Sequence, residues 1–306
     1  MPNIVLGKSG VAEYVVETIF GVMPANPAMQ WIGLIQSLKA TIKTEHEEYR
    51  TLKAAAATNK LQIEGDVLLG QSLDIDLDYV MQDWTFFKYV MSLTGGLTMT
   101  DNLANIAIGL ISPDATPKYA QLLGTKIDSA AVEIPERGKA KCTMKLKGAN
   151  LPVTTNNPWS ATNYKGTGSN ATKASTPPIP WSGITAITYG GSNITNSEVG
   201  SVKFSIENKL EAVLDAYGTL STKIGAIEPT ERTIKVSMTL KKKTIDAIVA
   251  LSNAFAAAAL VITFASPATT LTFAGAKIPQ DVIDFAPTGL TSLDVEFSGI
   301  TGLVFS

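Results

Sequence analysis

The segment SLDIDLDY, residues 72–79, alternates apolar and polar residues along its whole length. Its apolar positions are Leu73, Ile75, Leu77 and Tyr79, and its polar positions are Ser72, Asp74, Asp76 and Asp78. Because successive side chains of a strand point to opposite faces, this pattern predicts a strand with one buried face and one polar face. The same alternation recurs in KAKCTMKLK (139–147), VKFSIE (202–207), TIKVSMTL (233–240) and LDVEF (293–297). The sequence therefore predicts a mainly β protein.

Helical spacing of apolar residues is confined to short stretches. Residues 83–93 (DWTFFKYVMSL) and residues 244–258 (TIDAIVALSNAFAAA) carry apolar residues three and four positions apart. This spacing is typical of a helix with one buried face. Each stretch follows a predicted strand, so we expect short helices that flank the β-sheets.

Two parts of the chain carry their predicted elements in the same order. Each has a strand, a helix, a second strand, a turn, a Lys-Ile pair (126–127 or 277–278) and a closing strand that ends at Gly148 or Gly299. Such a repeat indicates two tandem related β domains. The stretch between them is rich in Asn, Thr, Ser, Gly and Pro, which is typical of a loop. We expect an extended N-terminal arm (1–40), a first β domain (41–151), a linker (152–181) and a second β domain (182–306).

The residue inventory argues against catalysis and metal binding. The 306 residues include one histidine, His46, and one cysteine, Cys142, so a histidine-rich metal site cannot form and catalysis by a Cys-His pair is not expected. Asp74, Asp76 and Asp78 have the spacing of a calcium loop, but apolar residues separate them and Tyr79 replaces the turn glycine. We predict no catalytic residue, no cofactor and no metal site, and we expect a structural protein rather than an enzyme.

Charge and hydropathy limit the partners. A net charge of −2 with 45% hydrophobic residues predicts a folded chain without the Lys and Arg surplus of proteins that grip DNA. The N-terminal sequence lacks the pattern of a secretory signal. The longest apolar run, residues 247–265, is interrupted by Ser252 and Asn253 and then becomes β-branched. No membrane association is therefore predicted.

The stretch ETIFGVMP, residues 17–24, resembles an opening found in tail tube proteins of tailed phages and archaeal viruses. Residues 126–133 with KAKCTMKLKGANL (139–151) are similar to the paired strands in mid-chain of that family. Residues 202–218 and 286–297 are similar to its later strand segments. The resemblance implies tail-tube type β-sandwich or barrel domains that assemble into stacked rings.

The resemblance also implies a function. The chain would be the major tail protein, a structural virion protein of the tail that assembles in the host cytoplasm and conducts viral DNA during ejection. Its implied partners are copies of itself, three two-domain chains or six chains per ring, and terminator, tape measure and baseplate or tip proteins. DNA would pass through the lumen without specific binding. Two other interpretations stay open: the inner tube of a contractile tail or injection system, and another virion or surface β-sandwich protein.

Two groups of residues are candidates for these roles. Cationic groups in the lumen would hold DNA phosphates, so we expect carboxylates to line it. The candidates for the lumen are Asp74, Asp76, Asp78, Asp294 and Glu296. The hypothesis of an acidic lining fails if the lysines of residues 139–147 share that lining. The candidates for contact with a neighbouring ring are Tyr14, Val16, Glu17 and Phe20.

Overall fold

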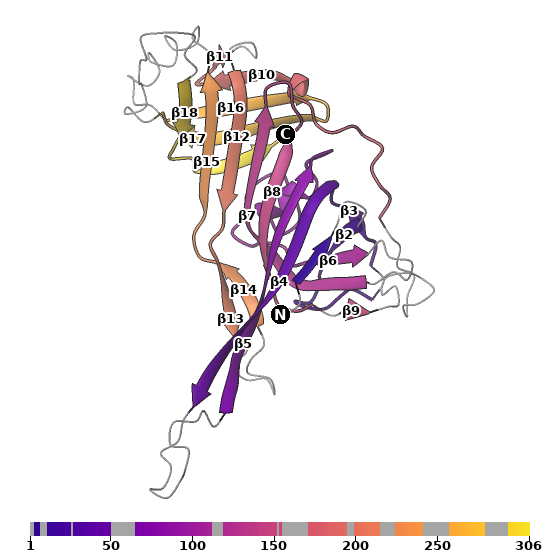
Figure 1. Cartoon of the computed structure of the whole chain (residues 1–306). Helices are drawn as coiled ribbons and strands as arrows, with labels where there is room; N and C mark the ends of the chain where they lie inside the picture. Colours follow the sequence, from indigo (N-terminus) through magenta and orange to yellow (C-terminus); the bar gives the residue numbers. More distant parts are fainter. Residues whose placement is uncertain are drawn as a thin grey trace, which may run out of the picture.

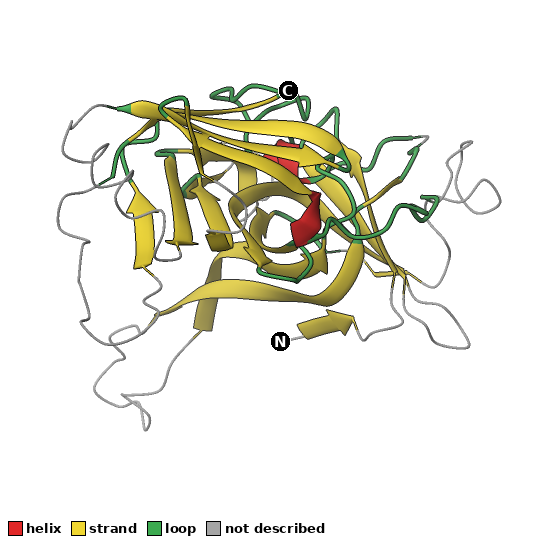
Figure 2. Ribbon diagram, turned by 90° about the horizontal axis from the view of Figure 1, so that it is seen from above, coloured by secondary structure: helices red, strands yellow, loops and turns green. Residues whose placement is uncertain are grey.

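The computed structural model describes most of the chain, and its mainly β architecture confirms the predicted fold class. The described residues are 3–6, 11–25, 27–49, 65–111, 119–151, 153–154, 171–194, 199–214, 224–240, 257–278 and 293–306. Within these ranges, helical structure is limited to two 3-10 turns, η1 (Phe87–Val90) and η2 (Trp181–Gly183). Figure 2 shows both turns lying among the strands.

Most strands belong to one twelve-stranded sheet, whose main path runs in the order β1-β4-β5-β8-β7-β12-β15-β18 (Figure 1). These strands are β1 (Asn3–Leu6), β4 (Leu34–Tyr49), β5 (Gly65–Val80), β7 (Tyr119–Pro135), β8 (Lys141–Gly148), β12 (Val199–Glu207), β15 (Thr233–Leu240) and β18 (Leu293–Phe297). The first part of β7 also pairs with β6 (Ile106–Ile111) and β9 (Val153–Thr154), and β6 continues to β2 (Val11–Val16) and β3 (Gln30–Trp31).

Two smaller sheets complete the described fold. The five-stranded sheet has the order β11-β10-β16-β17-β19 and lies across the upper end of the large sheet in Figure 1. Its strands are β10 (Ile184–Tyr189), β11 (Ser192–Ile194), β16 (Ala258–Ala265), β17 (Ala268–Ala276) and β19 (Gly302–Phe305). A two-stranded sheet joins β13 (Leu210–Leu214) to β14 (Ile224–Pro229).

The alternating sequences place the apolar half of each strand in one core. In β8, Cys142, Met144 and Leu146 are buried while Lys141 and Lys145 are exposed. The four apolar side chains of residues 72–79 are at most 1% exposed. Burial of each large apolar side chain stabilises the fold by about 1.5–3 kcal/mol. The hydrophobic effect therefore selects the face of each strand that the sequence pattern predicts.

The helix predicted over residues 83–93 is wrong, because only the four residues of η1 form a 3-10 turn there. The segment lies inside the core, where most of its large side chains are buried, although Leu93 is 47% exposed. The Trp84 ring, for example, lies 5.9 Å from Phe87 and 5.2 Å from Phe264 between centroids. Packing between the sheets thus outweighs a weak helical preference. Of the other predicted helix, residues 244–256 lie outside the described residues, and Ala258 begins β16.

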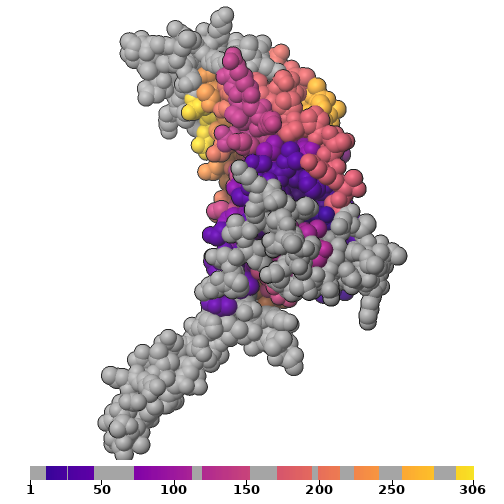
Figure 3. Space-filling model, turned by 45° about the vertical axis from the view of Figure 1, so that its right-hand side comes forward, coloured from indigo at the N-terminus to yellow at the C-terminus, as the bar shows by residue number. Residues whose placement is uncertain are grey.

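The same set of strand pairings occurs twice along the chain. In the first half, β4 pairs with β5, β5 with β8, β2 with β6 and β6 with β7. In the second half, β12 pairs with β15, β15 with β18, β10 with β16 and β16 with β17. All eight pairings are antiparallel. We call the two sets the first repeat and the second repeat; the second (salmon to yellow) lies mainly above the indigo and purple strands of the first in Figure 3.

Two of the register shifts also occur at equivalent positions of the two repeats. The β4 and β5 register shifts between Ile35 and Ser37, and the β12 and β15 register shifts between Val199 and Ser201. A second shift lies between Ile106 and Ile108 in β6, and between Ala258 and Leu260 in β16. These registers align Ala40 with Phe204, Ile75 with Val236, Gly124 with Gly275 and Lys126 with Lys277. Because a bulge needs its own backbone geometry, matching bulges at matching positions indicate one fold used twice.

The large sheet runs across both repeats. Residues 129–135 of β7, in the first repeat, pair with residues 201–207 of β12, in the second. The ranges predicted for the two domains therefore share one network of backbone hydrogen bonds. The domain limits themselves stay a prediction, and residues 152 and 155–170 of the predicted linker lie outside the described residues. Of the predicted N-terminal arm, β2, β3 and the start of β4 are part of the sheet.

Candidate functional site

Opposite its core, the large sheet carries a polar face that extends from β4 to β18. Its lysines are Lys39, Lys43, Lys141, Lys145, Lys147, Lys203 and Lys235, and its carboxylates are Asp74, Asp76, Asp78, Glu133, Glu207, Asp294 and Glu296. Among the described side chains, these seven lysines face the same side as these seven carboxylates, so their formal charges cancel. We call this surface the polar face.

The carboxylates of β5 are surrounded by lysines. Asp76 lies between Lys39 of β4 and Lys145 of β8 in the strand register. Directly opposed residues of antiparallel strands point to the same side of a sheet, so these three side chains share the polar face. Asp74 forms an ion pair with Lys43, and this contact raises the pKa of the Lys43 ammonium group. The carboxylates of β5 therefore do not form an acidic face of their own, contrary to the predicted composition of that face.

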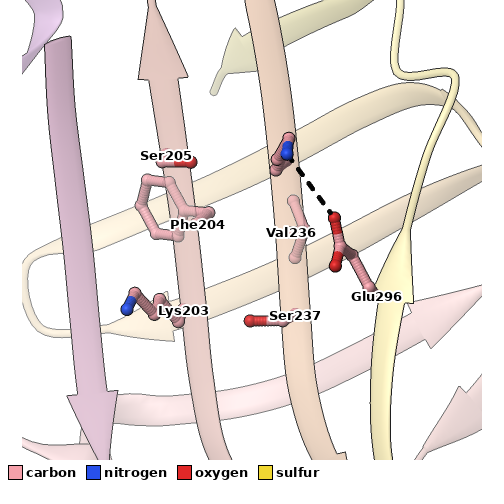
Figure 4. Close-up of a pocket in the computed structure, with 7 residues that line it drawn as sticks. Lys203, Phe204, Ser205, Val236, Ser237 and Glu296 are labelled. Atoms are coloured by element: carbon pink, nitrogen blue, oxygen red, sulfur yellow. Dashed lines mark ion pairs between the residues drawn. The ribbon is translucent and has the colours of Figure 1, made fainter.

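Asp294 and Glu296 extend the same mixed pattern on β18. Asp294 Oδ1 accepts a hydrogen bond from Thr239 Oγ1 at 2.6 Å, and Glu296 lies 3.9 Å from the Lys235 ammonium group. A hollow of about 220 Å³ lies beside Glu296 and Ser237. Figure 4 shows these two side chains on neighbouring strands. The hollow also touches Lys203. Its lining holds no histidine or cysteine, so it offers no activated nucleophile.

The remaining reactive groups of the described chain are poorly placed for chemistry. Cys142 is buried beside Tyr79, and burial raises the pKa of its thiol well above the usual range. A protonated, inaccessible thiol is a structural residue and not a nucleophile. No group of three His, Cys, Asp or Glu residues that could hold a metal ion occurs within the described ranges. The side chain of His46 is not among those that the structure describes.

The four residues predicted to contact a neighbouring ring have different environments. The Tyr14 side chain is fully buried, with its ring centroid 4.6 Å from that of Phe86. Val16 and Phe20 are partly buried. The exposed apolar side chains of this part of the chain are instead Ile19 and Val22, at 65% and 51%. Neither residue is among the four candidates, and the inter-ring role of those four residues stays a prediction.

Glu17 stabilises the local fold of the first repeat. Its two carboxylate oxygens accept hydrogen bonds from the backbone N–H groups of Gly21 and Gly124, both at 2.8 Å. Gly124 has a φ of 63°, a left-handed conformation that favours glycine. Burial raises the pKa of Glu17 to about 6, although the two N–H donors oppose the shift. Glu17 is therefore a buried structural carboxylate that can titrate in mildly acidic solution.

A buried polar cluster fastens the second repeat onto the first. The Asn208 side chain donates hydrogen bonds from Nδ2 to the backbone oxygens of Val90 and Ile127, both at 2.9 Å. Its Oδ1 accepts a hydrogen bond from Arg232 Nε at 2.6 Å. Asp128 contributes by accepting the backbone N–H of Leu210 at 2.8 Å. The sequence analysis missed this cluster, since an asparagine after an alternating strand is the usual pattern of an exposed turn.

The repeated β fold and its mixed charged face can now be set beside known families. The family model described as phage tail tube protein matches residues 8–299, which is nearly the whole chain. The chain belongs to this family. The tail tube protein is accordingly a structural component of the virion tail that self-assembles into a tube and associates with other tail proteins.

The tail tube protein has no significant match among curated proteins. Within the described residues, no helix has the length and apolar character that crossing a membrane requires.

Proposed function

We propose that the polar face of the large sheet lines the channel of the tail tube and that viral DNA passes along it during ejection. The observation that carries the proposal is the placement of Asp76 between Lys39 and Lys145. A lysine beside a carboxylate is already partly neutralised, so it gains less from contact with a phosphate and releases fewer counterions. A face with balanced charges gives DNA a path without tight attachment and without strong repulsion.

The ring is proposed to contain three chains. Each chain carries two repeats with matching registers, so three chains supply six similar units. A head-to-tail interface that closes by rotation produces such a ring, and a second interface along the axis stacks the rings into a tube. The same assembly would meet terminator, tape measure and baseplate or tip proteins at its ends, after formation in the host cytoplasm.

Microscopy and mass measurement test this assembly together. Negative-stain images of the purified protein are expected to show rings or tubes with a central hole. Native mass spectrometry of isolated rings is expected to count three chains of 32.4 kDa. Rings of six chains would contradict the proposed stoichiometry, and a protein that stays monomeric at high concentration would contradict the proposed function.

Cysteine labelling tests which face lines the channel. Thr143 lies on the polar face, and Thr185 is exposed on β10 of the five-stranded sheet. The Thr143→Cys variant is expected to react with a bulky maleimide as a monomer and to lose that reactivity in tubes, while a small maleimide still enters. The Thr185→Cys variant is the matched control. Equal bulky labelling of Thr143→Cys in monomers and tubes would place the polar face outside the channel.

A further inference from the structure

The contact between the two repeats of one chain provides a template for the contact between two chains. Within the chain, β7 covers the edge of β12 through seven antiparallel residue pairs, from Ser129 with Glu207 to Pro135 with Ser201. Lys203 lies opposite Glu133 in this register. The β12 edge is therefore fully covered by a strand of the preceding repeat.

The matching strand of the first repeat is β4. The shared registers align residues 37–43 of β4 with residues 201–207 of β12, and Lys39 with Lys203. Within the described residues, no strand of another repeat lies on this edge, so it lacks the strand that β7 provides for β12. An uncovered strand edge is a site where another chain adds a strand.

In the chain by itself, β1 covers this edge. Its four residues pair antiparallel with β4, from Asn3 with Thr41 to Leu6 with Leu38. Val5 lies opposite Lys39, at the register position where Glu133 lies opposite Lys203. The short β1 thus takes the place and the direction of β7, with four residue pairs instead of seven.

The opposite end of the large sheet begins to form the missing strand. Lys277 and Ser298 exchange backbone hydrogen bonds at 2.8 Å, at the position where Lys126 pairs with Lys147 in the first repeat. Lys126 is buried by the second repeat, whereas the equivalent Lys277 is exposed. The sequence that follows lies outside the described residues, and its letters VIDF (282–285) are similar to AVEI (131–134) of β7.

We propose that residues 37–43 of β4 receive the second repeat of another copy of this chain, and that β1 occupies this edge until that copy displaces it. The inference rests on the proposed ring and specifies its seam. The internal seam has seven residue pairs and β1 forms four, so a seam of the same kind between chains is favoured over β1 once subunits are concentrated. Until then, β1 protects the edge from unspecific pairing.

A reversible lock on β1 tests the proposal. The Val5→Cys/Lys39→Cys variant places a cysteine pair at opposed positions of β1 and β4, and the Lys39 side chain that it replaces is exposed. Cys142 is buried and does not compete for disulfide formation. The oxidised variant is expected to lose sedimenting tubes, and reduction of the same sample is expected to restore them.

The matched control is the Glu133→Cys/Lys203→Cys variant, whose cysteines lie at the equivalent register of the internal seam. That seam does not open, so this variant is expected to form tubes whether oxidised or reduced. Tubes from the oxidised Val5→Cys/Lys39→Cys variant, at the yield of the reduced form, would overturn the inference and leave the proposed function intact. Absence of tubes from the wild-type protein would overturn both.

A second variant addresses the same point without a disulfide. A chain that starts at residue 8 lacks β1, and its β4 edge is open from the outset. It is expected to form tubes at a lower protein concentration than the full chain. A folded protein, checked by circular dichroism, that needs a higher concentration or forms no tubes would show that β1 belongs to the assembled seam and would contradict its displacement.

Discussion

Both repeats extend a hairpin beyond the sheet, but only the second repeat holds its hairpin against the body. In the first repeat, β4 and β5 stay paired from Leu34 with Val80 to Tyr49 with Gly65, and the hairpin projects from the molecule (Figure 1). In the second repeat, the pairing of β12 and β15 ends near Asn208, and β13 and β14 form a separate two-stranded sheet. The equivalent hairpins of the two repeats thus extend in different ways from the large sheet.

The difference arises from what lies beside each hairpin. Lys209, with a φ of 42°, bends the chain between β12 and β13, and Asn208 beside it is fully buried against the first repeat. Leu210 and Ile227 add apolar contacts with Leu103. Within the described residues, the strand paired with the outer edge of β4 is β1, not a strand of another repeat. The comparison teaches that the second hairpin adopts its shape because a neighbouring repeat is present, and a neighbouring chain would supply one to the first.

The largest expected effect comes from removing the polar group at the bend. Asn208→Ala leaves the backbone oxygens of Val90 and Ile127 without their donor and Arg232 without its acceptor, so the free energy of unfolding should fall by about 4 kcal/mol. Urea unfolding measures this loss. The register-matched control is Thr44→Ala in β4, for which we expect a change within about 0.5 kcal/mol. Equal losses for the two variants would mean that the hairpins are held alike.

A smaller loss of stability is expected on changing Glu17. In the first repeat, Glu17 accepts a hydrogen bond from the left-handed Gly124, whereas in the second repeat the equivalent Gly275 packs beside Thr301. Glu17→Ala leaves two N–H groups without acceptors and should lower the free energy of unfolding by about 2 kcal/mol at pH 7. The pKa of Glu17 is about 6 in the folded state and about 4.5 in the unfolded state, so the folded state binds the proton more tightly. The free energy of unfolding gained from this protonation at low pH should therefore be lost as the pH rises from 4.5 to 6.

Glu17→Gln is the control for this pH dependence. The amide does not titrate, so its unfolding free energy should lack the decline that the wild type shows between pH 4.5 and 6. The difference between the two proteins isolates Glu17 from the other carboxylates. Parallel pH profiles would show that Glu17 does not titrate differently in the folded and unfolded states.

The smallest effect concerns the aligned lysines. Lys126→Ala removes a buried alkyl chain and an ion pair at 3.5 Å with the half-exposed Glu228, so we expect a loss of about 1 kcal/mol. Lys277→Ala should leave the free energy of unfolding of the monomer within about 0.5 kcal/mol of the wild type, because Lys277 is exposed. Thermal unfolding of the two variants at low protein concentration measures both. A larger loss for Lys277→Ala would reverse the proposed comparison.

Particular residues show how far the sequence could predict the structure. The burial of Leu73, Ile75 and Leu77 follows from the alternation and was predicted correctly. The position of Lys145 beside Asp76 was not predicted, because the two residues belong to distant segments and no local pattern indicates that these segments pair. Tyr14, a candidate for contact with a neighbouring ring, packs inside the core with Phe86, and the sequence pattern did not indicate this burial. Periodicity describes the face of a strand but not what covers that face.

The sequence by itself determined the class of fold, the two-sided strands and the repeated order of elements. These properties follow from the backbone, which turns each successive side chain of a strand to the opposite face. The tertiary structure alone decided which strands are neighbours, that lysines and carboxylates share one face, and that residues 83–93 form a buried turn. Such outcomes depend on the packing free energy of segments far apart in the chain, which no single segment carries.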